Sequence, residues 1–217
     1  MQVPRLLTMK PIRLAATREL LHRVFTRHPY IYRMQAPSDS AVGEALLASF
    51  RHSFQQYKAL ADRALAQIGP AEWLRQPAPG SNSAAVIVQH LAGNLRSRFT
   101  DFLTSDGEKL TRQRDQEFEE PTTAAGIPAL QAEWRAAWQV LFILLDELRP
   151  ADLLRTVHLR GEAHTVVLAV QRQVAHYAYH VGQLVQLAKI IRGEDFQSLS
   201  IPRGQSQQFN QRMTEGK

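Results

Sequence analysis

Apolar residues recur at the spacing of an amphipathic helix in four stretches of the chain, and polar or proline-containing segments separate these stretches. The expected helices cover about residues 41–68, 83–103, 128–148 and 166–192. The last stretch is apolar nearly all round and lacks proline, which is typical of a buried helix of six or seven turns. The pattern therefore predicts four long helices that pack against one another.

Residues that favour helix N-caps precede three of these stretches. They are Ser40, then Ser81 or Asn82, and Thr165. The charged segment between the second and third helices, which ends near Gly126, is long and suits a crossover between helices that run in the same direction. We expect a short hairpin or an extended turn around Gly161. After Gly193 we expect a short, polar, surface-lying segment in which Ile201-Pro202 is extended. The predicted fold is all-α, a four-helix bundle with a long crossover connection.

The basic character of the chain is concentrated at its N-terminus. The sequence has a net charge of +6 and a pI near 10.0, yet residues 1–36 alone hold seven basic residues against Glu19. The rest of the chain is neutral, so the bundle has no net attraction to nucleic acid. We predict a basic extension over 1–38, poorly ordered or a start-site artefact with initiation near Met34, and a bundle domain over 39–213.

Composition excludes several kinds of chemistry. The chain has no cysteine, so it cannot form disulfides, bind metal through thiolates or use a cysteine nucleophile. This agrees with a reducing, cytoplasmic environment. The most apolar helix carries Arg172, two histidines and several glutamines, which favours a core helix over a membrane span. The acidic residues are scattered over positions expected to be exposed, so paired-carboxylate catalysis has no support.

Three histidines form the strongest candidate site. His176 and His180 are four residues apart and thus share one helical face, and Gln173 and Gln183 extend the same polar stripe. His90 lies on the inward stripe of the second helix, where a bundle can bring it against the pair. Such a trio can bind one cation and leave positions open, and imidazole ligands suit Zn, Ni, Cu or Fe. The alternative is a set of core histidines hydrogen-bonded to backbone or tyrosine.

Each of several other polar residues has a structural interpretation as well as a functional one. Gln173, Gln183 and Asn94 either orient the imidazoles or satisfy other buried polar groups. Arg112 to Arg114 and the acidic run 117–120 indicate a solvated loop, or else a guard at the site entrance. Glu162 and His164 either lie near the mouth of the site or belong to a solvated turn. Exposed or terminal positions are expected for His22, His28, His52 and His158, and core positions for Trp73, Trp134 and Trp138.

With His90-Leu91-Ala92-Gly93-Asn94 on one helix and His176-x-x-x-His180-Val181-Gly182-Gln183-Leu184 on another, the chain resembles the DinB/YfiT-like superfamily of bacterial four-helix bundles. Further matching segments extend the resemblance, to an uncharacterised subfamily, over about 42–212. They are 98–109, 112–115, 160–165 and 198–204. The resemblance implies the bundle fold and a divalent metal, most plausibly Zn or Ni, held by His90, His176 and His180.

The superfamily includes thiol S-transferases, so the resemblance implies a metal-dependent transferase that acts with a low-molecular-weight thiol cosubstrate. Two alternatives remain: a non-catalytic, stress-associated metal-binding or dimerisation bundle, and a metal-dependent hydrolase. We expect a small-molecule substrate, no nucleic-acid or membrane partner, and a homodimer. The sequence identifies no catalytic residue beyond the three candidate ligands.

Overall fold

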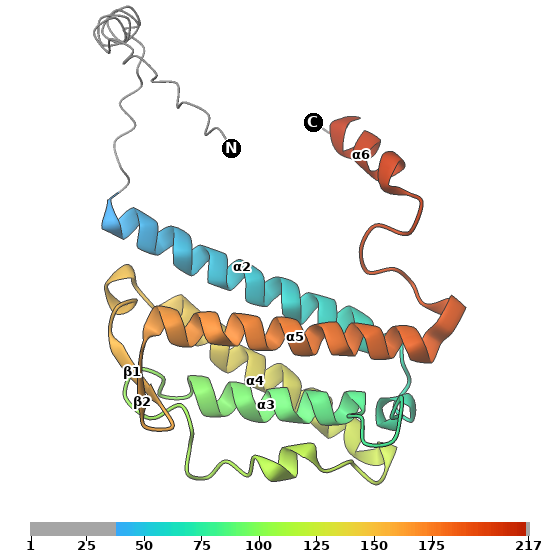
Figure 1. Ribbon diagram of the computed structural model, residues 1–217, viewed down its shortest axis with the longest axis horizontal. Coiled ribbons are helices and arrows are strands. Elements are labelled where there is room, and N and C mark those ends of the chain that lie inside the picture. The colour runs from blue at the N-terminus through green and yellow to red at the C-terminus, as the bar shows by residue number, and fades with distance from the viewer. Residues whose placement is uncertain (1–37, 216–217) are drawn as a thin grey trace, which may run out of the picture. The chain divides into compact units, whose positions relative to one another are not determined.

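The computed structural model describes residues 38–215 of the chain, and within them the helices dominate (Figure 1). The predicted all-α fold is confirmed. The four long helices are α2 (Asp39–Leu65), α3 (Ala84–Phe99), α4 (Ile127–Glu147) and α5 (Val166–Arg192). The shorter helix α6 (Ser206–Glu215) follows them near the C-terminus. Five 3-10 helices lie between them: η1 (Glu72–Leu74), η2 (Asp115–Phe118), η3 (Ala124–Gly126), η4 (Pro150–Asp152) and η5 (Gly193–Asp195).

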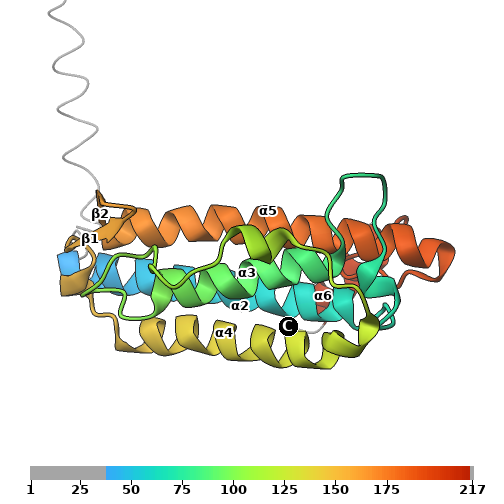
Figure 2. The same cartoon turned by 90° about the horizontal axis from the view of Figure 1, so that it is seen from below.

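The four long helices form the predicted bundle. Helix α5 packs along α2, and α3 packs along α4 (Figures 1 and 2). Helices α3 and α4 run in the same direction, and the segment 100–126 returns along the bundle to join them. The crossover predicted from the length of this connection is therefore confirmed.

Each of the four long helices contributes one aromatic ring to a cluster inside the bundle. Phe54 of α2 lies with its ring centroid 6.5 Å from Phe99, 6.4 Å from Trp138 and 5.7 Å from Tyr177. Centroid separations of this size, with tilted or edge-on rings, are favourable for aromatic packing. All four rings are buried, so this cluster fixes the four helices against one another, with α3 contributing the ring of its last residue. The other tryptophans, Trp73 and Trp134, are also buried, as the sequence predicts.

Helix ends differ from the predictions by a few residues. Ser38 and Ser83 are the N-caps of α2 and α3, in place of Ser40 and of Ser81 or Asn82, because their hydroxyl groups accept backbone hydrogen bonds three residues ahead. Thr165 caps α5 as predicted. Helix α3 ends at Phe99, because Thr100 is extended and Asp101 has a φ of 48°.

The predicted hairpin is present between α4 and α5. Strands β1 (Thr156–Leu159) and β2 (Glu162–Thr165) pair antiparallel, with Leu159 opposite Glu162. The two turn residues, Arg160 and Gly161, have φ values of 58° and 77°, which is the conformation that tight hairpins require. The hairpin is tied to the crossover segment because Gly107 N donates to His158 O across 2.8 Å.

The C-terminal segment contains a helix that the sequence analysis did not predict, because α6 follows Ile201 and Pro202. None of the residues of α6 is buried. The predicted bundle domain, 39–213, falls within the described residues, whereas the predicted basic extension lies outside them except for Ser38. Among the described residues, every helix is too short or too polar to cross a membrane.

Candidate metal centre

The structure brings together the three histidines that the sequence singles out. Each of His90, His176 and His180 offers a ring nitrogen, and these three atoms lie within 4.8 Å of one another. His90 comes from the buried face of α3, and the other two lie one turn apart on α5. The side chains of His90 and His180 are buried, whereas His176 is partly exposed.

Each imidazole has an oxygen partner at its Nδ1 atom. Glu117 Oε2 lies 3.0 Å from His90 Nδ1, and Gln183 Oε1 lies 2.8 Å from His180 Nδ1. Gln173 Oε1 lies 3.4 Å from His176 Nδ1, so the two glutamines predicted to orient imidazoles do contact them. An oxygen acceptor at Nδ1 favours the tautomer in which the proton is on that atom and the Nε2 lone pair is free.

The free nitrogens point toward one another. His90 Nε2 and His176 Nε2 are 3.3 Å apart. Burial lowers the pKa of His176 to about 3, with His180 and His90 adding to the effect. Burial likewise lowers the pKa of His180 to about 4. Both rings are therefore neutral at physiological pH, the form in which histidine binds a metal.

The donor set fits a divalent transition metal. Imidazoles that hold a proton on Nδ1 present a free lone pair on Nε2, and such groups are typical ligands of zinc and nickel. Among the described residues, the cluster contains these three histidines and no fourth histidine or carboxylate ligand. A metal held by three protein ligands keeps at least one coordination position for a small molecule.

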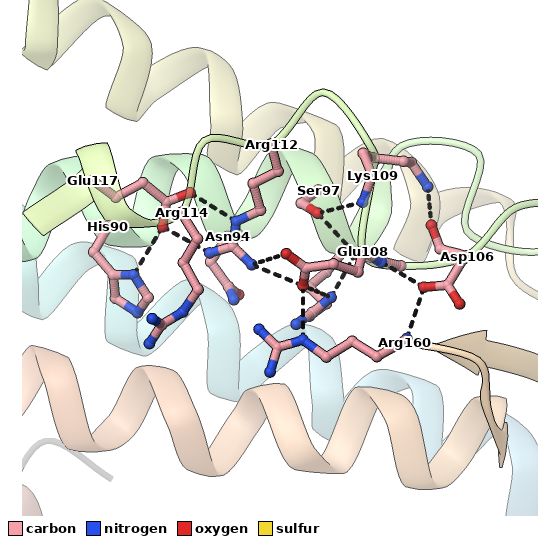
Figure 3. Close-up of polar contacts among 12 residues, drawn as sticks. His90, Asn94, Ser97, Asp106, Glu108, Lys109, Arg112, Arg114, Glu117 and Arg160 are labelled. Atoms are coloured by element: carbon pink, nitrogen blue, oxygen red, sulfur yellow. Dashed lines mark hydrogen bonds and ion pairs between the residues drawn. The ribbon is translucent and has the colours of Figure 1, made fainter.

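Glu117 is the residue of this site that the sequence analysis missed. Its side chain is buried, and Arg112 donates from Nε to Oε1 and from Nη2 to Oε2, each across 2.7 Å (Figure 3). Burial alone would raise the pKa of Glu117, but the hydrogen bonds from His90 and Arg112 outweigh it and lower the pKa below its ordinary value. The interpretation of 112–120 as a solvated loop is therefore wrong for Arg112 and Glu117.

A signal for this contact exists in the sequence. Phe118 is the only apolar residue between Leu110 and Pro121, and its ring packs against His90 with centroids 4.6 Å apart. Arg114 also packs against the Phe118 ring, with its guanidinium carbon 5.0 Å from the ring centroid. A single aromatic residue in a charged run thus marks the point where the crossover segment meets the histidines.

A network of charged groups continues from Arg112 toward the hairpin. The carboxylate of Glu108 lies 2.8 Å from Arg98, 3.3 Å from Arg112 and 3.2 Å from Arg160 (Figure 3). Arg98 and Arg112 are largely buried, so the charges need these partners. The network joins α3, the crossover segment and the hairpin beside the histidine cluster.

Asn94 does not contact an imidazole, contrary to one of the two predicted roles. Its Oδ1 atom accepts a hydrogen bond of 3.0 Å from the hydroxyl group of Tyr177. Both side chains are buried, and complete burial raises the pKa of Tyr177 well above its ordinary value, so the hydroxyl remains protonated. This bond satisfies two buried polar groups and links α3 to α5.

The remaining candidates lie apart from the three-histidine cluster. His164 is mostly buried and lies 3.5 Å from the exposed Glu162 carboxylate, and neither residue belongs to the cluster. His52 and His158 are exposed, and His22 and His28 lie outside the described residues. A cavity of about 1130 Å³ lies under the crossover segment and is lined by Arg112 and Glu117, but by none of the histidines.

Comparison with known proteins identifies the family. The sequence model described as "Protein of unknown function (DUF1572)" matches residues 41–205. No curated protein and no solved structure matches the chain. The matched segment includes the four long helices, except the first two residues of α2, and the three histidines. Because the match covers more than half of the chain, this protein belongs to the DUF1572 family.

Proposed function

We propose that this protein is a metal-dependent enzyme, in which His90, His176 and His180 hold one divalent metal, and that it transfers a low-molecular-weight thiol to an electrophile. One observation carries the metal site: the ligand nitrogens of the three rings lie within 4.8 Å, and each Nδ1 atom has an oxygen acceptor. The Nε2 atoms of His90 and His176 face each other across 3.3 Å, and with both ring protons on Nδ1 a bound metal would satisfy both lone pairs.

The proposed reaction rests on the resemblance to the DinB/YfiT-like superfamily together with the open side of the donor set. A metal bound here would lower the pKa of a coordinated thiol and so supply a thiolate at neutral pH. In the transfer, the sulfur forms a bond to an electrophilic carbon, the leaving group departs with its electron pair, and the thiol proton passes to solvent. Zinc and nickel are the metals we favour for three neutral imidazoles.

Aromatic residues around the cluster support this role by packing against two of the ligands. Phe118 covers His90, and Tyr179 packs beside His180 with ring centroids 4.3 Å apart. His176 is the ligand with the most exposed side chain, so we propose that a small-molecule substrate approaches from its side. We also propose that the protein forms a homodimer. The metal content of the purified protein can be measured whether or not it does.

Elemental analysis of the purified protein tests the metal site directly. We expect near-stoichiometric zinc or nickel in the wild-type protein and little in His90→Ala. His158→Ala, which changes an exposed histidine, is the matched control and should keep the metal. The absence of bound metal from the wild-type protein, even after reconstitution with zinc or nickel, would exclude the metalloenzyme proposal.

Thiol-transfer assays with the host's own thiol then test the reaction. We expect turnover by the metal-loaded wild-type protein and none by His90→Ala. The non-catalytic alternative predicts a bound metal whose removal unfolds the bundle, because structural metals contribute folding free energy. Circular dichroism of the protein before and after chelation distinguishes these outcomes, since the enzyme proposal expects the helices to survive removal of the metal.

A further inference from the structure

The buried carboxylate of Glu117 lies between a ligand histidine and an arginine. Its Oε2 atom is 3.0 Å from His90 Nδ1, and both of its oxygens accept hydrogen bonds from Arg112. The side chains of all three residues are less than a tenth exposed. Water therefore cannot readily replace any of these partners.

Arg112 determines which hydrogen bonds the Glu117 carboxylate can make. A guanidinium has donors and no acceptors, so both Glu117 oxygens must accept from Arg112. The carboxylate is ionised and has no proton to give to the imidazole. His90 Nδ1 must therefore be the donor in the 3.0 Å contact, and the proton of the neutral ring is on Nδ1. The lone pair of His90 Nε2 is then free and faces His176 Nε2.

His90 differs in this respect from the other two histidines. His176 and His180 have neutral amide oxygens at Nδ1, from Gln173 and Gln183. His90 alone has a charged acceptor, and a carboxylate at Nδ1 raises the basicity of the opposite ring nitrogen more than an amide does. His90 is thus the histidine whose orientation and electron donation depend most on its partner.

The surrounding structure fixes this carboxylate in place. Arg112 also contacts Glu108, which in turn binds Arg98. On the other side, Gly93 provides the space, because an ideal Cβ atom there would lie 2.6 Å from Glu117 Cδ. The side chain therefore has little freedom to leave His90.

We propose that Glu117 is a positioning residue of the metal centre, which holds His90 in the tautomer with the proton on Nδ1 and so sets the metal affinity of the site. This inference deepens the proposed three-histidine metal site and rests on it. It does not depend on thiol transfer. Glu117 acts through His90 and Arg112, and the crossover segment thereby becomes part of the metal centre.

Glu117→Gln is the sharpest variant, because it keeps the shape and removes one acceptor oxygen. Oε2 faces both Arg112 Nη2 and His90 Nδ1, whereas Oε1 accepts from Arg112 Nε alone. The amide oxygen therefore retains more hydrogen bonds at the Oε2 position, where a neutral acceptor replaces the charged one, and the NH₂ group then opposes the Nε donor of Arg112. His90 Nδ1 then has only a neutral amide acceptor, as His176 and His180 have, and the preference of its proton for Nδ1 is weakened. We therefore expect the variant to bind Zn²⁺ about 10- to 100-fold more weakly than the wild-type protein in competition with a chromogenic chelator.

Nitrogen-15 NMR of the metal-free proteins measures the tautomer of His90 and requires neither bound metal nor enzymatic activity. At alkaline pH we expect His90 of the wild-type protein to carry its proton on Nδ1 and His90 of Glu117→Gln to shift toward the tautomer with the proton on Nε2. Glu119→Gln is the matched control, since Glu119 is an exposed carboxylate in the same segment, and it should match the wild-type protein in both measurements.

A proton on Nε2 of His90 in the wild-type protein would overturn the inference, even if the variant fails to fold. An unchanged tautomer and an unchanged Zn²⁺ affinity in folded Glu117→Gln would also overturn it and leave Glu117 a structural ion-pair residue. Loss of affinity with the tautomer shift supports the inference whether or not thiol transfer is detected. Failure of the proposed reaction is thereby separated from failure of this proposal.

Discussion

Glu117 packs its carboxylate directly over Gly93, one turn along α3 from His90. An ideal Cβ atom at Gly93 would lie 2.6 Å from Glu117 Cδ and would clash with Oε1. Glycine inside a helix usually costs about 1 kcal/mol relative to alanine, so its presence here needs a local reason. The approach of the carboxylate supplies that reason, because no larger residue leaves room for it.

Gly93→Ala should therefore weaken the metal site although alanine is the better helix former. The added methyl group displaces Glu117 from His90, and the buried Arg112 loses the geometry of its paired hydrogen bonds. We expect Zn²⁺ affinity to fall about 10- to 100-fold, as for loss of a partner that orients a ligand. Competition with a chelator measures the affinity, and urea denaturation measures the stability.

Gly182→Ala is the matched control for that experiment. Gly182 lies in the interior of α5, and a Cβ atom there would meet nothing within 4 Å. Helix propensity alone should then stabilise the protein by about 0.5–1 kcal/mol and leave metal affinity unchanged. Equal effects of the two substitutions on metal binding would show that the space at Gly93 is not what matters.

The contrast between these glycines illustrates how far sequence reasoning reaches. The helices follow from a local period of apolar residues, and the polar stripe Gln173, His176, His180 and Gln183 follows from positions on one helix. His90 can be added because its own helix shows which face is buried. Each of these inferences uses residues within a few turns of one another.

Glu117 could not be found in the same way. Its partner His90 is 27 residues distant, and the intervening chain includes a crossover whose path depends on contacts with α3 and the hairpin. In a run of charged residues, a buried carboxylate has the same pattern as its exposed neighbours. Phe118 marks the segment that meets His90, but it does not show which of its charged neighbours is buried. Burial of Arg112 and Glu117 is decided by tertiary contacts, namely the space at Gly93 and the Glu108 network.

Tyr177→Phe should separate bundle stability from metal binding. Removal of the buried hydroxyl group leaves Asn94 Oδ1 without its 3.0 Å donor, which should destabilise the fold by about 1–3 kcal/mol. No imidazole loses a partner, so Zn²⁺ affinity should not change. Tyr179→Phe, on the exposed face of the same helix, should alter stability by less than about 0.5 kcal/mol. A loss of metal in Tyr177→Phe would instead indicate that Asn94 serves the ligands.

His176→Ala tests whether the most exposed ligand is needed for metal but not for folding. The side chain is only partly buried, and alanine favours the helix, so the thermal midpoint of the metal-free protein should be nearly unchanged. Zn²⁺ affinity should fall by at least about 100-fold, the upper end of what loss of an outer hydrogen-bonding partner costs. His52→Ala, at an exposed site on α2, is the control, and unfolding of His176→Ala alone would favour a structural role.

The free energy of unfolding should depend on pH through Asp106, which lies at the junction between the crossover segment and the hairpin. Its Oδ1 atom accepts hydrogen bonds from the backbone N–H groups of Glu108 and Arg160, and Oδ2 accepts from Gly161. These bonds, that from Glu108 first, lower the pKa of Asp106 from 3.8 to about 2. A pKa that is lower in the folded state stabilises the fold above pH 3.8, and this contribution is lost as the pH falls to about 2.

Asp106→Asn should accordingly lower the free energy of unfolding by about 1–2 kcal/mol at neutral pH, after allowance for solvent screening of a partly exposed group. The difference from the wild-type protein should shrink between pH 3.8 and about 2, because the wild-type carboxylate is then protonated as well. Urea denaturation of both proteins across this range measures the difference, with Asp115→Asn as a control at a fully exposed carboxylate. A difference that stays constant with pH would mean that Asp106 holds the hairpin by shape and not by charge.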